Sequence, residues 1–268
     1  MVKVLTVNIG AASVERARRQ LAWLQNRLED VFILTETSSG PGTQIILDHY
    51  RKLGFAVKHV VDPTGDRGVA LISRIQFRSD QTITLAGVSL PSRTVIATLS
   101  TTPAIYVVGI YVPSRDRSVE KTDKKRHFME SLLQSLIKLP LEVRRCLILG
   151  GDYNVIDRDH QPQYRIFLPF ERDFLSELER LGINDAHKLC NPGFQAYTWV
   201  GRTEDGYRYD YFNVGAGLTE KVRTLEYDHS TRTGAQRITD HSAAVLEINI
   251  AIVDYITPLS KIEQQPLF

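Results

Sequence analysis

Short apolar runs separated by polar turns occupy most of the chain, and their lengths are typical of β-strands rather than helices. The runs are rich in Val, Ile and Leu, and turn residues such as Gly, Pro, Asn and Asp separate them. One run begins at residue 147 and leads into Gly150-Gly151. The pattern predicts further strands over residues 2–9, 31–34, 55–61, 68–73, 82–90, 93–100, 104–112, 222–227 and 243–248.

Four longer stretches carry apolar residues every three or four positions, which is typical of amphipathic helices. The first begins after the N-cap residue Ser13, and its apolar stripe extends to Leu28. The second ends before Gly54, which is placed as a C-cap glycine. The last two are expected over residues 118–139 and 167–181.

Many short strands combined with a few long helices favour an α/β fold in which two sheets pack face to face between helices. Such a two-sheet sandwich has four layers in the order α/β/β/α, and its strands are expected to be mostly antiparallel. Alternation of strand and helix is too sparse for a doubly wound parallel sheet. Residues 249–268 have a weak apolar pattern, which predicts a closing strand and a tail. Without an internal repeat, low-complexity tract or linker, we expect one domain spanning residues 1–268.

Composition and charge narrow the class of protein without indicating a function. A chain of 268 residues can bury a large core, and a net charge of +2 does not by itself indicate a nucleic-acid binder. Cys146 and Cys190 lack metal-binding spacing. No signal peptide or bilayer-spanning apolar run is visible, so we expect a cytoplasmic protein that does not bind membranes. A monomer is the favoured state.

The stretch after the apolar run at residue 147 carries the first candidate chemistry. Gly150 and Gly151 lack a Cβ and allow another chain or a ligand to approach closely. Asp152 and Asn154 lie two positions apart, so both side chains point to the same side of an extended backbone. A carboxylate and an amide aimed at one point can hold a metal-bound phosphate and orient a water. Taken alone, these residue types are also those of an ordinary turn after a strand.

Other polar side chains also stand at or near the ends of predicted strands. They are Asn8, Glu36, Tyr111, Asp210 and Asp240. Strand ends of a two-sheet sandwich meet at one rim, so these side chains are expected near Asp152. Carboxylates grouped there would repel one another, and a hard divalent cation is their natural partner. Oxygen ligands, without a Cys/His cluster, favour Mg²⁺ or Mn²⁺ over zinc.

These polar strand ends resemble the motifs of a known family. The matching segments are Asn8, LTE at Glu36, GVALISR at 68–74, YVP at Tyr111, GGDYN at 150–154, YRYDY around Asp210 and TDH at 239–241. Their order and spacing are similar to those of the endonuclease/exonuclease/phosphatase superfamily, which includes exonuclease III, abasic-site endonucleases and DNase I. The resemblance extends over residues 2 to about 248. It implies a DNase I-like fold and metal-dependent hydrolysis of phosphodiester bonds.

The resemblance implies a metal-binding group and a group that activates water. Glu36 would be the main metal ligand, with Asn8 beside it and Asp240 as a further ligand. Asp152 would orient or deprotonate the attacking water, and Asn154 would position this water and the phosphate. The implied cofactor is Mg²⁺ or Mn²⁺.

The resemblance also implies groups that stabilise the transition state. Tyr111 and His241 would stabilise the pentacovalent phosphorus, and Asp240 would hold the His241 ring in one tautomer. Asp210 would supply or relay a proton to the leaving oxygen. Each residue alone has an ordinary structural interpretation, such as a strand-edge cap or a half-buried aromatic. Their joint occurrence is what indicates a site.

Residues next to the catalytic positions differ from those of abasic-site endonucleases. Such enzymes usually have Gln-Glu-Thr-Lys around the metal glutamate, where this chain has Thr-Glu-Thr-Ser at 35–38. Ser114 and Ala243 stand where an asparagine and a proline are common. The resemblance therefore supports phosphodiester hydrolysis without specifying an abasic-site substrate.

Basic and aromatic residues near the predicted rim favour a nucleic acid as substrate, with DNA preferred to RNA. Arg115 and Arg208 are candidates for phosphate contacts, and Trp199 is a candidate for stacking on an unpaired base. Core packing is an equal alternative for the aromatic residues around Asp210. The basic run over residues 121–126 is interpreted as a solvated helix face that could also touch a phosphate backbone.

Two other functions stay open on the sequence. A phosphatase or phosphodiesterase could use the same residues on a phosphoinositide, phospholipid or small nucleotide. The Pro-Ala-Trp-Cys-Asp-Arg-type signature of inositol-polyphosphate 5-phosphatases is absent around Asp210, which argues against that reading. A non-catalytic nucleic-acid-binding relative would have lost at least one catalytic residue, and none is lost here. The prediction is therefore a metal-dependent endo- or exonuclease that uses an Asp-activated water.

Overall fold

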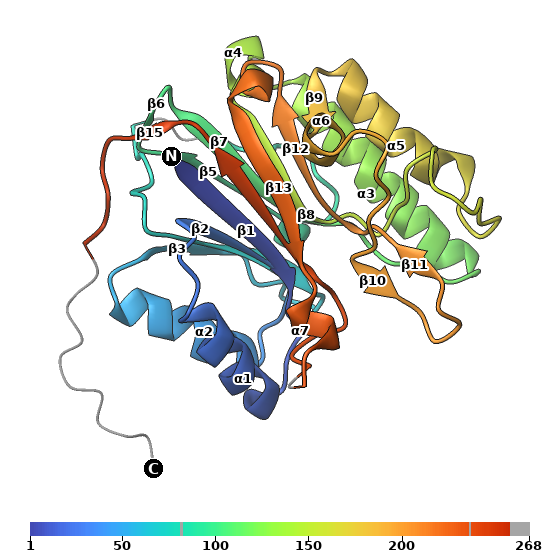
Figure 1. Cartoon of the computed structure of the whole chain (residues 1–268), viewed down its shortest axis with the longest axis horizontal. Helices are drawn as coiled ribbons and strands as arrows, with labels where there is room; N and C mark the ends of the chain where they lie inside the picture. The colour runs from blue at the N-terminus through green and yellow to red at the C-terminus, as the bar shows by residue number, and fades with distance from the viewer. Residues whose placement is uncertain (81–82, 236, 258–268) are drawn as a thin grey trace.

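Two β-sheets pack face to face at the centre of the computed structural model, which describes residues 1–80, 83–235 and 237–257 (Figure 1). Within these residues the larger sheet has six strands. In spatial order they are β13 (Val222–Asp228), β14 (Ala243–Ile248), β1 (Val2–Asn8), β2 (Val31–Thr37), β4 (Gly68–Ser73) and β3 (Ala56–His59).

The smaller sheet has five strands in the described part of the chain. In spatial order they are β5 (Thr94–Leu99), β7 (Ile105–Tyr111), β8 (Leu147–Asp152), β12 (Asp210–Gly215) and β9 (Ile183–Asp185). Two short antiparallel pairs lie outside these sheets. They are β10 (Trp199–Val200) with β11 (Gly206–Tyr207), and β6 (Thr101–Thr102) with β15 (Ala251–Ile252).

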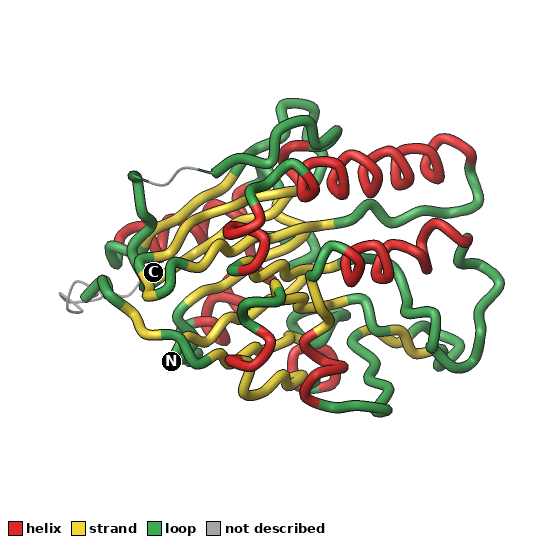
Figure 2. Tube along the Cα trace, turned by 90° about the horizontal axis from the view of Figure 1, so that it is seen from above, coloured by secondary structure: helices red, strands yellow, loops and turns green. Residues whose placement is uncertain are grey.

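Helices cover the outer faces of both sheets, and the strands run side by side between them (Figure 2). On the larger sheet lie α1 (Val14–Leu24) and α2 (Pro41–Lys52). On the smaller sheet lie α3 (Val119–Ile137) and α5 (Pro169–Arg180). Shorter helical segments are α4 (Leu141–Arg145), α6 (Ala186–Cys190), α7 (Ser230–Thr233) and two 3₁₀ turns, Pro91–Arg93 and Thr219–Lys221. The predicted α/β/β/α layering is confirmed.

Antiparallel pairing dominates the two sheets, as predicted. The strands β1 and β2 run parallel, as do β7 and β8, and the other named strand pairs of the described residues are antiparallel. Valine, isoleucine and leucine side chains from both sheets fill the space between them. Gly150 of β8 faces this space, where a Cβ would lie 2.4 Å from a ring carbon of Phe212. The glycine therefore makes room for an aromatic ring of the core.

The strand register brings the candidate residues to one rim. In the parallel pairs, Asn8 lies beside Thr35 and Tyr111 lies beside Asp152. In the antiparallel pair of β8 and β12, Asp152 lies directly opposite Asp210. The carboxyl ends of β1, β2, β7 and β8 therefore meet the start of β12.

The first helix is shorter than its apolar pattern predicts. It ends at Leu24, and the side chain of Leu28 is 79% exposed. The Asn26 side chain donates a hydrogen bond to the Ala22 carbonyl at 2.8 Å, and such a local bond competes with helix continuation. The apolar residue at position 28 is thus outside the helix that its spacing suggested.

The predicted strand over residues 82–90 is wrong for its described part, and Thr82 lies outside the described residues. Residues 83–90 instead lie along α3, where Leu85 and Val88 pack into the cluster under the helix. Side chains of α3 also bind this segment, since Ser135 Oγ donates to the Ala86 carbonyl at 2.7 Å. The apolar alternation of the segment serves packing on a helix rather than pairing with a strand.

Two further features complete the comparison with the sequence. The predicted closing strand is present only as the two-residue β15, and residues 258–268 of the predicted tail lie outside the described residues. No helix within the described ranges combines the length and hydrophobicity needed to cross a bilayer.

Replacement of Gly151 by alanine is expected to destabilise the fold severely. The residue has φ +143°, and a Cβ there would lie 1.9 Å from the Ile110 carbonyl oxygen, so the backbone of two central strands would have to move. We expect the free energy of unfolding, measured by urea denaturation, to fall by more than about 3 kcal/mol.

Gly65→Ala is the matched control for this change. Gly65 also has a positive φ, +82°, but an added Cβ would meet no atom within 4 Å. Its cost should be about 1 kcal/mol. If the free energy of unfolding fell equally in the two variants, the close contact at Gly151 would not contribute to the cost of the substitution.

Candidate active site

The rim between the two sheets collects most of the polar residues that the sequence singled out. Ligand atoms of Asp152, Asp210 and His241 lie within 4.8 Å of one another, and all three residues are buried. Asp152 ends β8, Asp210 begins β12, and His241 lies just before β14. Strand ends from both sheets therefore build one cluster.

Asn8 links this cluster to Glu36. Its Nδ2 donates to Glu36 Oε1 at 3.1 Å and to Asp152 Oδ2 at 2.9 Å. Its Oδ1 accepts a hydrogen bond from the Gly10 N–H at 2.8 Å, which fixes the orientation of the amide. In this arrangement Asn8 acts as a donor to two carboxylates, and its role as a metal ligand stays a prediction.

Three side chains contact the carboxylate of Glu36. The Tyr111 hydroxyl donates to Oε1 at 3.1 Å, beside the Asn8 amide, and Arg67 forms an ion pair with Oε2. The backbone of Glu36 has φ +54°, which is uncommon for a residue other than glycine. Left-handed conformations of this kind cluster at functional sites, where surrounding contacts hold them.

Asp152 is fixed by Asn154 and by the buried groups around it. The Asn154 N–H donates to Asp152 Oδ1 at 2.9 Å, and Asn154 also has a positive φ, +48°. The Asn154 Nδ2 donates to the Val112 carbonyl at 3.0 Å. Burial raises the pKa of Asp152; His241 opposes this shift and the nearby Asp210 adds to it. The carboxyl can therefore accept a proton near neutral pH.

Asp210 holds the ring of His241. The distance between Asp210 Oδ2 and His241 Nδ1 is 2.8 Å, and His241 Nε2 lies 4.0 Å from Asp152 Oδ2. Burial lowers the pKa of His241, but Asp210 and Asp152 outweigh this effect and raise it to about 9. The second oxygen, Asp210 Oδ1, is buried and has no hydrogen-bond partner among the described residues. Most buried acceptors in proteins are paired, so this oxygen is a candidate for contact with a further donor or a cation.

The expectation that Asp240 holds His241 is wrong. Asp240 and His241 line the same cavity but bind different partners. Asp240 is exposed and accepts a hydrogen bond from Trp199 Nε1 at 3.0 Å, while His241 turns inward to Asp210. The orienting carboxylate therefore comes from β12 rather than from the residue next to the histidine.

A cavity of about 830 Å³ opens in front of the cluster. Glu36, Asn154, Asp240 and His241 line it, as do Arg115 and Trp199. Trp199, Tyr209 and Phe167 form an aromatic wall, with the rings of Trp199 and Tyr209 5.9 Å apart. The cavity thus combines a polar end with a flat apolar side.

Comparison with known proteins agrees with this geometry. The family model described as the endonuclease/exonuclease/phosphatase family matches residues 5–241. The chain belongs to this family. Its match extends across the strand ends that carry the rim residues, so the resemblance predicted from the motifs is confirmed.

Relatives of this endonuclease/exonuclease/phosphatase family member include nucleases. It is 27% identical over 266 residues to the exodeoxyribonuclease of Bacillus subtilis, covering 92% of this chain and 100% of the relative. Among solved structures, the 3′ phosphatase NExo from Neisseria bound to a product DNA hairpin has a TM-score of 0.77 at 21% identity, over 92% of this chain and 99% of that one. An AP endonuclease from Archaeoglobus fulgidus has a TM-score of 0.76 at 21% identity, over 93% and 100%. The predicted DNase I-like fold is confirmed.

Arg208 of this family member lies apart from the cavity. It is only 6% exposed, and its guanidinium is paired with Asp185 of β9 at 2.5 Å. The guanidinium also stacks over the Tyr211 ring, 4.3 Å from its centre. A cation that is already buried and paired is poorly placed for a phosphate, so the residue has a structural role here.

Three charged residues at the site were not singled out by the sequence. Arg67 pairs with Glu36, while Lys125 and Glu171 line the cavity as a buried ion pair. Lys125 was interpreted as part of a solvated face, yet it lies three residues before the buried Phe128 on α3. This position on the apolar face of α3 was the sequence feature that could have indicated burial of Lys125.

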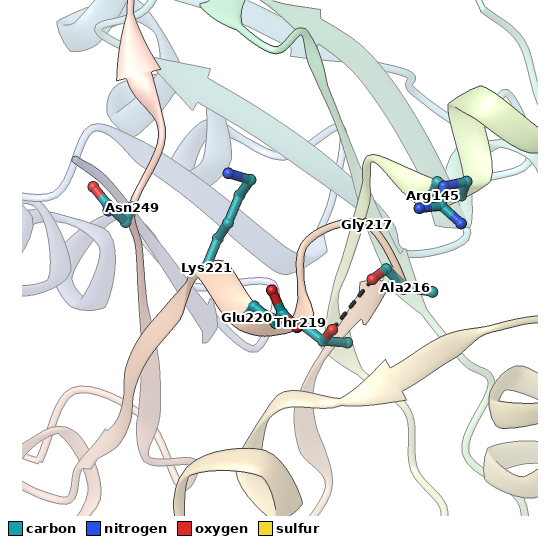
Figure 3. A pocket seen from close by; sticks show the side chains of 7 residues that line it. All are labelled: Arg145, Ala216, Gly217, Thr219, Glu220, Lys221 and Asn249. Carbon is teal, nitrogen blue, oxygen red and sulfur yellow. Dashed lines mark hydrogen bonds between the residues drawn. The ribbon is translucent and has the colours of Figure 1, made fainter.

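A second hollow lies at the opposite end of the sheets (Figure 3). Its lining is Arg145, Ala216, Gly217, Thr219, Glu220, Lys221 and Asn249, as the close view shows. Arg145 precedes β8 and Ala216 follows β12, whereas Asp152 and Asp210 lie at the other ends of these strands. With one carboxylate and no histidine, this hollow lacks the groups for phosphoester chemistry.

Replacement of Asp210 by asparagine is expected to lower the pKa of His241 from about 9 by on the order of one unit or more, because the ring loses its charged partner. The wild-type pKa lies above the ordinary value of 6.5, so protonation of His241 stabilises the fold fully below pH 6.5. That contribution is lost as the pH rises through 9. Histidine-selective NMR titration measures the shift directly.

Asp240→Asn is the control for this titration. Asp240 acts on His241 only at longer range, so the pKa should fall less than in the Asp210 variant. A larger fall after the Asp240 change would return the orienting role to Asp240.

Proposed function

We propose that this chain is a metal-dependent nuclease that hydrolyses phosphodiester bonds in DNA, with a water activated by Asp152. The observation that carries the proposal is the buried cluster of Asp152, Asp210 and His241, joined through Asn8 to Glu36. Family membership and nuclease relatives support the same reaction class.

The residues of the rim fit a hard divalent cation. Oxygen donors predominate, and Asp210 Oδ1 is a buried acceptor without a partner in the described chain. Glu36 is the proposed main ligand, with Asp240 and Asn8 as further ligands. When bound, Mg²⁺ or Mn²⁺ would polarise a phosphoryl oxygen and lower the pKa of a water.

Side chains of the protein carry out proton transfer and charge stabilisation in the proposed reaction. Asp152, whose pKa is raised by burial, takes the proton of the attacking water, and the Asn8 and Asn154 N–H groups hold its two oxygens in place. His241, kept protonated by Asp210, and the Tyr111 hydroxyl stabilise negative charge that develops on the phosphoryl oxygens. The His241 imidazolium, paired with the Asp210 carboxylate, donates its Nε2 proton to the leaving oxygen, and the proton that Asp152 takes from the water can restore the imidazolium, since His241 Nε2 lies 4.0 Å from Asp152 Oδ2.

DNA is the proposed substrate because the cavity offers both charge and flat apolar surface. Arg117 and Arg165 line it, are exposed and can approach a phosphate backbone, whereas the guanidinium of Arg115, which also lines it, is paired with Glu171. Trp199 and Tyr209 offer faces on which a base or a sugar can lie. The B. subtilis relative is named an exodeoxyribonuclease, and the Neisseria neighbour was solved with a DNA hairpin.

A labelled substrate panel tests the reaction and its alternatives. It contains single- and double-stranded DNA, an abasic-site duplex, DNA with a 3′ phosphate, RNA and a phosphoinositide, each with Mg²⁺, Mn²⁺ or EDTA. We expect metal-dependent cleavage of DNA that falls at least a hundredfold in Asp152→Asn and in His241→Ala, without loss of folding by circular dichroism.

Each other outcome has a defined meaning. Release of phosphate from the phosphoinositide alone would replace the nuclease by a lipid phosphatase that uses the same site. Binding of DNA without cleavage of any substrate would favour the non-catalytic relative. Full activity of either variant would remove the cluster from the mechanism.

Arg67 gives a second prediction, which concerns the metal. Its guanidinium forms an ion pair with Glu36 Oε2, so this pair must open before a cation can use that oxygen. We expect Arg67→Gln to bind Mn²⁺ several-fold more tightly than the wild type in the absence of substrate, as measured by calorimetry.

Two further variants serve as controls for the Mn²⁺ affinity of Arg67→Gln. Arg117→Gln removes an exposed arginine of the same cavity, and we expect unchanged Mn²⁺ affinity. Glu36→Gln should weaken binding strongly. Equal or weaker Mn²⁺ binding after Arg67→Gln would contradict competition between arginine and metal.

A further inference from the structure

Two oppositely charged residues are buried together behind the cavity. Lys125 of α3 and Glu171 of α5 are each 1% exposed, and Lys125 Nζ lies 2.6 Å from Glu171 Oε1. Lysine and glutamate are rarely buried to this extent unless they are paired. Burial lowers the pKa of Lys125, and the Glu171 carboxylate opposes that shift.

The ammonium of Lys125 has a second acceptor in the active site. It donates to the main-chain carbonyl of Asn154 at 2.6 Å. Asn154 has φ +48°, and its own N–H and side-chain amide are bound by Asp152 and by the Val112 carbonyl. Lys125 thus supplies the charged contact at the carbonyl of a residue held in an unfavourable backbone conformation.

The other oxygen of Glu171 collects a second set of donors. Arg115 binds Oε2 through Nε at 3.0 Å and through Nη2 at 2.5 Å, and the Leu168 N–H binds it at 2.8 Å. Burial would raise the pKa of Glu171, but Arg115 and Lys125 lower it below its ordinary value. The carboxylate therefore joins the loop after β7, which carries Arg115, to the turn after β8, which carries Asn154.

We propose that Lys125 is a positioning residue for the reaction, which holds the Asn154 carbonyl and thereby sets the Asn154 N–H against Asp152. The inference rests on the proposed function and adds a residue to it. Lysine and arginine bring two positive charges to one carboxylate, so this buried group also leaves one unit of positive charge beside the phosphate site.

A structural role alone would not require this arrangement. Replacing a buried ion pair by neutral side chains of similar size is often without cost to stability, whereas removing one partner is strongly destabilising. The double variant Lys125→Met/Glu171→Gln exploits this difference, because it removes both charges of the pair, keeps the volume and leaves an amide oxygen at position 171 that can still accept from Arg115 and from the Leu168 N–H. It leaves the Asn154 carbonyl without its donor in a protein that is expected to fold.

The experiment compares four variants on a 5′-labelled DNA duplex with a recessed 3′ end, in the presence of Mn²⁺. They are Lys125→Arg, Lys125→Met, the double variant, and Lys138→Met as a control at the exposed far end of α3. Each is measured for kcat, KM and Tm. We expect kcat of the double variant to fall at least tenfold with KM changed less than threefold and Tm within a few degrees of the wild type.

The arginine variant and the control complete the test. Lys125→Arg should recover most of kcat because it restores a charged donor, and Lys138→Met should match the wild type. A double variant with wild-type kcat would overturn the proposal. A loss that follows Tm alone in all Lys125 variants would also overturn it, since a structural role would then be sufficient.

A readout that needs no substrate separates this inference from the proposed function. In NMR spectra of the ¹⁵N-labelled protein, the Asn154 backbone N–H and the two side-chain N–H protons should give one set of sharp signals in the wild type and broadened or shifted signals in the double variant. If wild-type protein cleaves no nucleic acid, the proposed nuclease function fails, and the Asn154 signals still decide whether Lys125 positions this residue. Unchanged signals would overturn the positioning role.

Discussion

The hydrogen bonds of the Asn8 amide hold together the two halves of the site. Asn8 ends a strand of the larger sheet, and it binds Asp152, which ends a strand of the smaller sheet. Its second N–H reaches Glu36, the proposed metal ligand. Hydrogen bonds to charged groups contribute about 1.5–3 kcal/mol each, and here they also fix the distance between two carboxylates that would otherwise repel. The relative position of the sheets is therefore a condition for the chemistry.

Because the carboxylates at this rim are buried, their charges are balanced by a neighbouring cation and by hydrogen-bond donors. Asp152 and Asp210 face each other across a strand pair, which places two carboxylates in a poorly hydrated space. The imidazolium of His241 lies between them; the Asn154 N–H binds Asp152 Oδ1, and the Asn8 amide binds Oδ2, the oxygen that lies 4.0 Å from His241 Nε2. Behind the rim, Lys125 and Arg115 balance the charge of the buried Glu171 carboxylate in the same way. Both groups place a cation at the cavity that is the proposed phosphate site.

The sequence predicted the layers and most of the site because both depend on local patterns. Strand ends with polar residues could be recognised in order, and Asn8, Glu36 and Asp152 do meet. Contacts between segments that are distant in the sequence could not be predicted from these local patterns. Asp210 rather than Asp240 holds His241, and the Asp240 carboxylate accepts a hydrogen bond from Trp199 instead. The burial of Arg208 depends on Asp185, and that of Lys125 on Glu171, partners that no spacing in the chain reveals.

The order of the site residues along the chain has a consequence for biosynthesis. The first of them, Asn8, and the last, His241, lie at opposite ends of the sequence, yet both contact Asp152 or its immediate neighbours. A nascent or truncated chain that lacks the segment before β14 has no imidazole for the cluster, and a chain in which only the larger sheet has formed has no Asp152 for Asn8 to join to Glu36. The cluster therefore assembles only after the segment before β14 has been synthesised, so under the proposed function an unfinished copy of the protein would have no activity on nucleic acids.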